Sequence, residues 1–134
     1  HVVVIEEAGT VVAAMTGYPI GREPAPVAGE TPAMVRPLRE LEQRVPSTWH
    51  LDVLATYPRA RGRGLGSRLV ALAEGYARND GLKGVSIIVA DGNVGARRLY
   101  ERLGYEELDR AAIVKDGWDS PSSEWILLMK ASEA

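Results

Sequence analysis

Arg-Gly-Arg-Gly-Leu-Gly-Ser, residues 61–67, lies between a run typical of a strand and a run typical of a helix. The upstream run, residues 50–57, is rich in strand-forming side chains and ends at Pro58. In the downstream run apolar residues recur at helical spacing: Leu65, Leu69, Leu72, Ala73, Tyr76 and Ala77. The sequence therefore predicts a strand, a glycine-rich turn and an amphipathic helix in that order.

The glycine-rich turn has the chemistry of an anion site. Its glycines remove side chains from the start of the helix, so a ligand can approach the backbone closely. The first N–H groups of a helix lack intrahelical acceptors and carry partial positive charge, which favours phosphates. We therefore interpret the turn as a pyrophosphate-binding site formed by Arg61, Gly62, Arg63, Gly64, Leu65, Gly66 and Ser67. The alternative is a tight surface loop with two solvated arginines.

The spacing of the turn narrows the class of ligand. A P-loop would need Gly-x-x-x-x-Gly-Lys-Ser/Thr, and the turn contains no lysine. A dinucleotide fingerprint would need Gly-x-Gly-x-x-Gly, whereas these glycines fall at 62, 64 and 66. The pattern Arg61-x-x-Gly64-x-Gly66 resembles the Arg/Gln-x-x-Gly-x-Gly/Ala signature of the GNAT superfamily of N-acetyltransferases. In that family this turn holds the pyrophosphate of acetyl-coenzyme A.

A second segment carries the same resemblance. The apolar run 85–89 is typical of a strand, Asn93 is a good N-cap for a following helix, and Gly104 is a good C-terminal stop. The run Asn93-x-x-Ala96-x-x-Leu99-Tyr100-Glu101-x-Leu103-Gly104-Tyr105 is similar to the family pattern Asn-x-x-Ala-x-x-Leu-Tyr-x-x-x-Gly-Phe. The resemblance is specific from about residue 50 to residue 105.

The resemblance implies an acyltransferase that moves the acetyl group of acetyl-CoA to an amine by direct attack. It implies that backbone groups of Leu54, Ala55 and Thr56 pair with the pantetheine arm, and that Asn93 contacts the pantetheine region. It implies that Tyr100 lies near the thioester sulfur as the catalytic residue. The structural alternative for Asn93 is a plain helix N-cap. For Tyr100 it is an aromatic residue that packs in the core.

The acceptor and the base are open at this stage. Glu42, His50 and Asp52 are weak candidates for a general base, and loss of the amine proton through water is an alternative. The acceptor is expected to be a small-molecule or peptide amine. Two other functions remain: a non-catalytic module that binds or senses acyl-CoA, and a different phosphate ligand in the same turn.

Composition sets further limits. With 16 Lys and Arg against 18 Asp and Glu, a net charge of −2 gives no electrostatic argument for a nucleic-acid partner. The absence of cysteine and the presence of two histidines argue against a metal site and against a cysteine nucleophile. No apolar stretch approaches the roughly 20 residues of a membrane span. We expect a soluble, cytoplasmic protein with no membrane or nucleic-acid partner.

Residues 2–5 and 11–15 predict a β-hairpin around a turn at 7–10. The GNAT fold normally has a strand and two helices before this hairpin. We therefore expect residues 1–134 to be a single GNAT-like domain that is incomplete at its N-terminus. The outer edge of the hairpin has no predicted element to cover it, so a homodimer is one alternative.

The segment 21–31 is interpreted as an exposed connection to a short helix. One face of this helix should carry Met34, Leu38, Leu41 and Val45, with Pro32 or Pro37 in its first turn and Pro46 as its end. The helix could be a lid over the acceptor pocket, a dimer contact, or simple packing against the domain. Residues 110–114 and 125–130 predict two closing strands around a loop with Gly117, Trp118 and Pro121.

The order of these elements predicts an α/β fold with a mixed, mostly antiparallel sheet and flanking helices. Strands near 51–56 and 85–89 should form a central parallel pair joined by a right-handed helical crossover. By resemblance to the family, this pair should splay apart and admit the donor.

Overall fold

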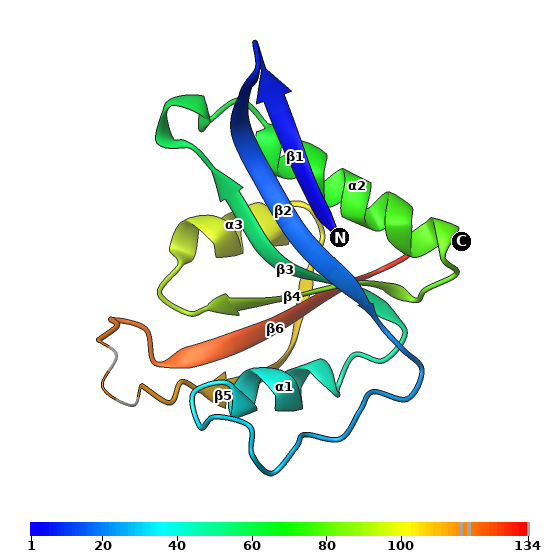
Figure 1. Ribbon diagram of the computed structural model, residues 1–134, viewed down its shortest axis with the longest axis vertical. Coiled ribbons are helices and arrows are strands. Elements are labelled where there is room, and N and C mark those ends of the chain that lie inside the picture. The colour runs from blue at the N-terminus through cyan, green and yellow to red at the C-terminus, as the bar shows by residue number, and fades with distance from the viewer. Residues whose placement is uncertain (116, 118, 134) are drawn as a thin grey trace.

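The described residues form one six-stranded sheet with three α-helices packed on it (Figure 1). The computed structural model describes residues 1–115, 117 and 119–133. The strand order is β1-β2-β3-β4-β6-β5, and every neighbouring pair is antiparallel except β3 and β4. This confirms the predicted fold class. The elements are β1 (Val2–Glu7), β2 (Thr10–Ile20), α1 (Arg36–Glu42), β3 (Thr48–Thr56), α2 (Leu65–Asn79), β4 (Gly84–Ala90), α3 (Val94–Arg102), β5 (Glu106–Ala112) and β6 (Glu124–Ala131).

The parallel pair at the centre of the sheet is short. β3 and β4 pair only from Thr48↔Gly84 to Leu51↔Ile87. Beyond Leu51, β3 continues along β2 as far as Thr56, while β4 continues along β6 (Figure 1). A β-bulge in β3, where two successive ladder pairs involve Leu51 and Val53, accompanies the separation. The two strands therefore splay apart, as the family resemblance predicted.

Helix α2 covers one face of the sheet and completes the main core. Its buried stripe consists of Leu65, Leu69, Val70, Ala73 and Ala77, which pack with residues of β2, β3 and β4. The prediction was wrong for Leu72, which is 45% exposed. At 100° per residue Leu72 lies beyond the margin of this stripe, so its side chain points past the sheet into solvent.

The second strand of the hairpin is longer than predicted, because β2 continues past Met15 to Ile20. The far half of β2 pairs with β3, and its other side has no strand beside it once β1 ends opposite Thr16. Pro19 is tolerated there because its missing N–H falls on a free edge. Gly17 is required for packing, since a Cβ at this position would lie 2.1 Å from the ring of Trp49.

Helix α1 is shorter than predicted and packs on the face of the sheet opposite α2. Pro37 lies in its first turn as expected, but the helix ends at Glu42, four residues before Pro46. Met34 and Val45 therefore lie outside the helix. A second apolar cluster joins α1 to the sheet and supports the packing interpretation: Ile20, Leu41, Val45 and Leu127.

The closing strands are present with shifted bounds. β5 covers 106–112 rather than 110–114, because its pairing with β6 begins at Glu106↔Met129, directly after the α3 stop. β6 covers 124–131 and contains the predicted 125–130. Trp118 of the predicted loop lies outside the described residues. Among the described helices, none has the length and apolar character needed to cross a membrane.

Candidate active site

A cleft of about 770 Å³ opens where β3 and β4 separate, and α2 and α3 provide its walls. It brings together eleven of the twelve residues that the sequence predicted for the site. They are Leu54, Ala55 and Thr56 of β3; Arg61, Gly62, Gly64, Leu65, Gly66 and Ser67 of the turn; and Asn93 and Tyr100 of the α3 segment.

The start of α2 presents unpaired backbone N–H groups at this cleft. Gly64 is the N-cap, and its φ of 76° turns the chain sharply into the helix without a capping side chain. Within the described part of the chain, the N–H groups of Leu65, Gly66 and Ser67 donate to no acceptor. Three helix-start donors therefore remain available to an anion.

The two arginines of the turn differ in their surroundings. Arg61 lines the cleft, and its Nε donates to the carbonyl of Thr56 at 3.3 Å. Arg63 is not among the residues that line the cleft, and its guanidinium pairs with the carboxylate of Glu7 on the hairpin. The Glu7 carboxylate raises the pKa of Arg63, so this charge is engaged by the hairpin rather than offered to the cleft.

Helix α3 forms the opposite wall. The side chain of Asn93 accepts the N–H of Ala96 at 3.3 Å, so Asn93 is the predicted N-cap. Asn93 still lines the cleft, and its amide N–H₂ donates to no acceptor among the described residues. Ala60, Gly95, Ala96, Leu99 and Arg102 also line the cleft but were not among the predicted site residues. For Ala96 and Leu99 a sequence signal existed, since both belong to the motif that carried the resemblance.

Tyr100 is largely buried on the inner face of α3, and its side chain faces both the core and the cleft. Burial raises the pKa of Tyr100 to about 12, so the phenol stays protonated near neutrality. Its hydroxyl has no hydrogen-bond partner among the described residues, whereas the Tyr105 hydroxyl donates to Glu74 at 2.9 Å. The structural and the functional interpretation of Tyr100 are therefore compatible. The ring packs in the core, and the hydroxyl has no acceptor among the described residues.

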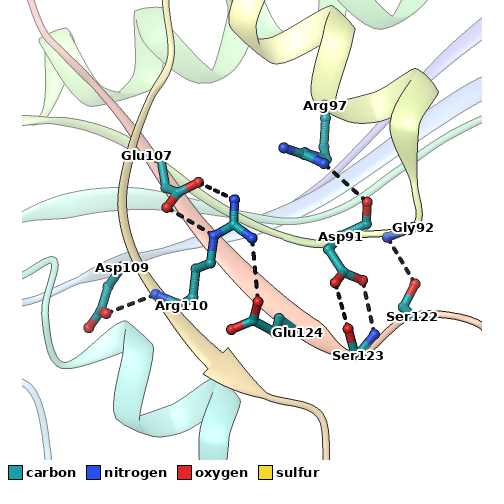
Figure 2. Close-up of polar contacts among 9 residues, drawn as sticks. All are labelled: Asp91, Gly92, Arg97, Glu107, Asp109, Arg110, Ser122, Ser123 and Glu124. Atoms are coloured by element: carbon teal, nitrogen blue, oxygen red, sulfur yellow. Dashed lines mark hydrogen bonds and ion pairs between the residues drawn. The ribbon is translucent and has the colours of Figure 1, made fainter.

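A polar clasp links the segment just before α3 to the segment just before β6 (Figure 2). The carboxylate of Asp91 accepts both the N–H of Ser123 at 3.0 Å and its hydroxyl at 2.9 Å. The N–H of Gly92 donates to the Ser122 hydroxyl at 3.1 Å, and Arg97 donates to the carbonyl of Asp91 at 3.3 Å. Hydrogen bonds from Ser123 lower the pKa of Asp91. The clasp sets the position from which α3 carries Asn93 and Tyr100 into the cleft.

Two of the three candidate bases lie together where the end of α1 meets β3. Glu42 accepts hydrogen bonds from the Tyr18 hydroxyl and, at 2.7 Å, from Arg39. His50 is 2% exposed, and its Nε2 lies 3.9 Å from Oε1 of Glu42. Asp52 follows His50 by two residues and is exposed. None of the three lines the cleft between α2 and α3.

Comparison with known proteins shows which family the chain matches. Residues 1–105 match the acetyltransferase (GNAT) family. The uncharacterized N-acetyltransferase YhfO of Bacillus subtilis is 42% identical over 57 residues, which are 42% of this chain and 38% of YhfO. The matched stretch therefore spans well under half of that relative.

Two solved structures share the fold. One, from Bacillus anthracis, is described as a streptothricin acetyltransferase in complex with acetyl coenzyme A. It is 15% identical with a TM-score of 0.69 over 97% of this chain and 61% of that chain. The other is the ribosomal-protein-S18-alanine N-acetyltransferase of Escherichia coli, 15% identical with a TM-score of 0.67 over 100% of this chain and 70% of that chain.

The family match covers more than three quarters of the sequence, and the fold, the glycine-rich turn and the splayed strands agree with it. The chain therefore belongs to the GNAT family of acetyltransferases.

Proposed function

We propose that this protein is an acetyl-CoA-dependent N-acetyltransferase that transfers the acetyl group to a primary amine by direct attack. One observation carries the proposal. The unpaired N–H groups at the start of α2 open into the same cleft as the free hydroxyl of Tyr100. A site for an anionic carrier and a donor for a leaving group therefore lie in one cavity.

The donor would be held by backbone groups and one arginine. The N–H groups of Leu65, Gly66 and Ser67, with the charge of Arg61, suit the diphosphate of coenzyme A. Beyond Leu51, β3 is paired on one side only, so in 54–56 the other edge has no strand beside it, although the Thr56 carbonyl accepts from Nε of Arg61. An extended pantetheine arm can pair there as an added strand would. The free amide of Asn93 suits the same arm.

Tyr100 would stabilise the departing thiolate by a hydrogen bond. A thiol has a pKa near 8.5, and burial raises the pKa of Tyr100 to about 12. Full proton transfer from the phenol to the thiolate would therefore be uphill by about 5 kcal/mol. A hydrogen bond to the developing charge avoids this cost while keeping the phenol neutral. The proton that completes the thiol comes from the amine nitrogen as the amide forms.

The acceptor is proposed only as a primary amine, either a small molecule or a peptide. We also propose that residues 1–134 act as one domain, because all strands among the described residues belong to one sheet. Homodimerisation stays a prediction.

Calorimetry with acetyl-CoA and an assay of free-thiol release test the proposal. The amine panel should include a streptothricin, a peptide that begins with alanine, and a polyamine. We expect acetyl-CoA to bind and thiol to be released with at least one amine. Binding without release for every amine would favour the non-catalytic acyl-CoA module. Binding of a nucleotide in place of acetyl-CoA would favour a different phosphate ligand.

A further inference from the structure

A buried hydrogen-bond chain under α1 determines where His50 carries its proton. The hydroxyl of Thr48 donates to the carbonyl of Val45 at 2.7 Å, which uses its only proton. Thr48 must therefore accept from the Ser86 hydroxyl, 2.8 Å away. Ser86 has then used its own proton and must accept from Nδ1 of His50 at 2.9 Å. Neutral His50 consequently bears hydrogen on Nδ1 and a free lone pair on Nε2.

The free lone pair faces a second acceptor. Nε2 of His50 lies 3.9 Å from Oε1 of Glu42. That carboxylate is held in place, since Oε1 accepts from the Tyr18 hydroxyl and Oε2 from Arg39. No donor among the described residues lies between the imidazole nitrogen and the carboxylate oxygen. Two acceptors that face each other in this way leave a position that one additional proton can bridge.

His50 and Glu42 lie close to the point where β3 and β4 separate. The β3–β4 ladder ends at Leu51, so His50 lies one residue before the position where the strands separate. On the α1 side, Tyr18 and Glu42 line a hollow of about 300 Å³, whose outer wall comes from the segment 24–28. The pair thus lies between the apex of the splay and a cavity open to solvent on the face opposite α2.

The influences on the pKa of His50 act in opposite directions, and the lowering influence of burial is the largest. Burial lowers the pKa of His50, and Arg39 of α1 acts in the same direction. Glu42 of α1 and Asp52 of β3 oppose this change, while β2 contributes the Tyr18 ring and β4 the Ser86 hydroxyl. The imidazole is therefore neutral near neutrality, and its Nε2 carries an unprotonated lone pair.

We propose that His50, with Glu42, accepts the proton of the acceptor ammonium, which enters through the hollow on the α1 face. This rests on the proposed function. The ammonium gives one proton by way of Oε1 of Glu42 to Nε2 of His50, and this leaves a neutral amine. Its lone pair forms the C–N bond to the acetyl carbon and the C–S bond breaks. The second amine proton completes the thiol of coenzyme A, and His50 later releases its proton to water.

The first test needs no substrate. The chain has two histidines, so a long-range ¹H–¹⁵N spectrum of protein with labelled histidine contains two imidazole patterns. The His50→Asn variant identifies which belongs to His50. We expect the Nδ1–H tautomer at pH 7.5, and its conversion to Nε2–H in Ser86→Ala. An Nε2–H tautomer in the unmodified protein would overturn the proposal even if His50→Asn does not fold, because the spectrum can then be assigned by elimination with His1→Gln.

The second test uses the amine that gives the fastest thiol release with the unmodified protein. We expect His50→Asn and Glu42→Gln each to lower kcat/KM for that amine about a hundredfold at pH 7. The KM for acetyl-CoA should change less than twofold, and the loss should shrink toward pH 9 as free amine becomes abundant.

Glu74→Gln is the matched control, because Glu74 also accepts a tyrosine hydroxyl and pairs with a cation, Lys130, on the other face. It should leave kcat/KM unchanged. A loss confined to Asp52→Asn, or normal turnover in His50→Asn, would overturn the proposal while the acetyltransferase activity stands. If the unmodified protein binds acetyl-CoA but acetylates nothing, the proposed function fails, and this role for His50 fails with it.

Discussion

Tyr100 and Tyr105 lie edge to face, with ring centroids 6.0 Å apart and ring planes at 61°. The two rings pack in one core, but their hydroxyls face different surroundings. The Tyr105 hydroxyl is bound to Glu74, whereas the Tyr100 hydroxyl is free of partners in the described part of the chain. A comparison of Tyr100 with Tyr105 can therefore distinguish the contribution of ring packing from that of the hydroxyl group.

Tyr100→Phe should lower kcat about ten- to a hundredfold, because a hydrogen bond to a charged group contributes about 1.5–3 kcal/mol. The Kd for acetyl-CoA should change less than twofold, since the ring is kept. Tyr105→Phe is the control: it should cost about 1 kcal/mol of stability and leave kcat unchanged. Steady-state thiol release and calorimetry measure the two effects. Normal turnover in Tyr100→Phe would contradict the role given to this hydroxyl.

Gly64→Ala should weaken acetyl-CoA binding about tenfold. A φ of 76° costs a residue with a Cβ about 1–2 kcal/mol, and relaxing it redirects the first N–H groups of α2. Gly9→Ala introduces the same kind of strain, at a φ of 81° in the β1–β2 turn, at a residue that does not line the cleft. Gly9→Ala should reduce stability by a similar amount and leave the Kd unchanged. Equal loss of binding in both variants would mean that strain alone explains the effect.

Arg61→Ala should raise the Kd for acetyl-CoA three- to tenfold at low salt, and by less at high salt, because the lost attraction is screened. Arg63→Ala should change the Kd less than twofold, since Arg63 is engaged by Glu7 on an exposed surface. Titrations at two salt concentrations measure both variants. A larger effect for Arg63 would show that the hairpin releases it when the ligand binds.

The sequence predicted most of the residues that line the cleft between α2 and α3, because the determinants of this geometry are local. Gly64, the first turn of α2 and the Asn93 cap each depend on a few neighbouring residues. They lie at one cleft because β3 and β4 are neighbouring parallel strands, so the segments that follow them meet at the same edge of the sheet. The sequence wrongly placed Arg63 in the cleft, because its partner, Glu7, lies 56 positions away on the hairpin. No local pattern indicates such a contact.

The α1 side could not be predicted to the same degree. The sequence named Glu42 and His50 as separate candidates, and their meeting depends on how α1 packs across the sheet. Ser86 was absent from the predicted site, because an isolated serine within an apolar strand gives no signal of its partners. Likewise, the length of β2 depends on its pairing with β3, and Pro19 within it favours an earlier end.

Gly17→Ala should destabilise the fold by about 3 kcal/mol or more. The added Cβ would lie 2.1 Å from the Trp49 ring and 2.7 Å from the carbonyl of His50, and neither the fully buried ring nor the strand backbone can move away. Gly21→Ala is the control, because nothing lies within 4 Å of its added Cβ. It should change stability by less than about 0.5 kcal/mol. Urea unfolding measures both, and equal midpoints would contradict the packing argument.

The pH dependence of stability should report the buried state of His50. Its pKa is lowered in the folded protein, mainly by burial, so below about pH 6.5 the unfolded chain binds a proton that the native state does not. The free energy of unfolding should therefore fall as the pH drops from 6.5 toward the lowered pKa. Above 6.5, His50 is neutral in both states and contributes no slope. His50→Gln should be less stable at neutral pH but flatter across this interval, and urea midpoints at half-unit pH steps would show it. An unchanged slope in His50→Gln would mean that other groups, and not this imidazole, take up the proton on unfolding.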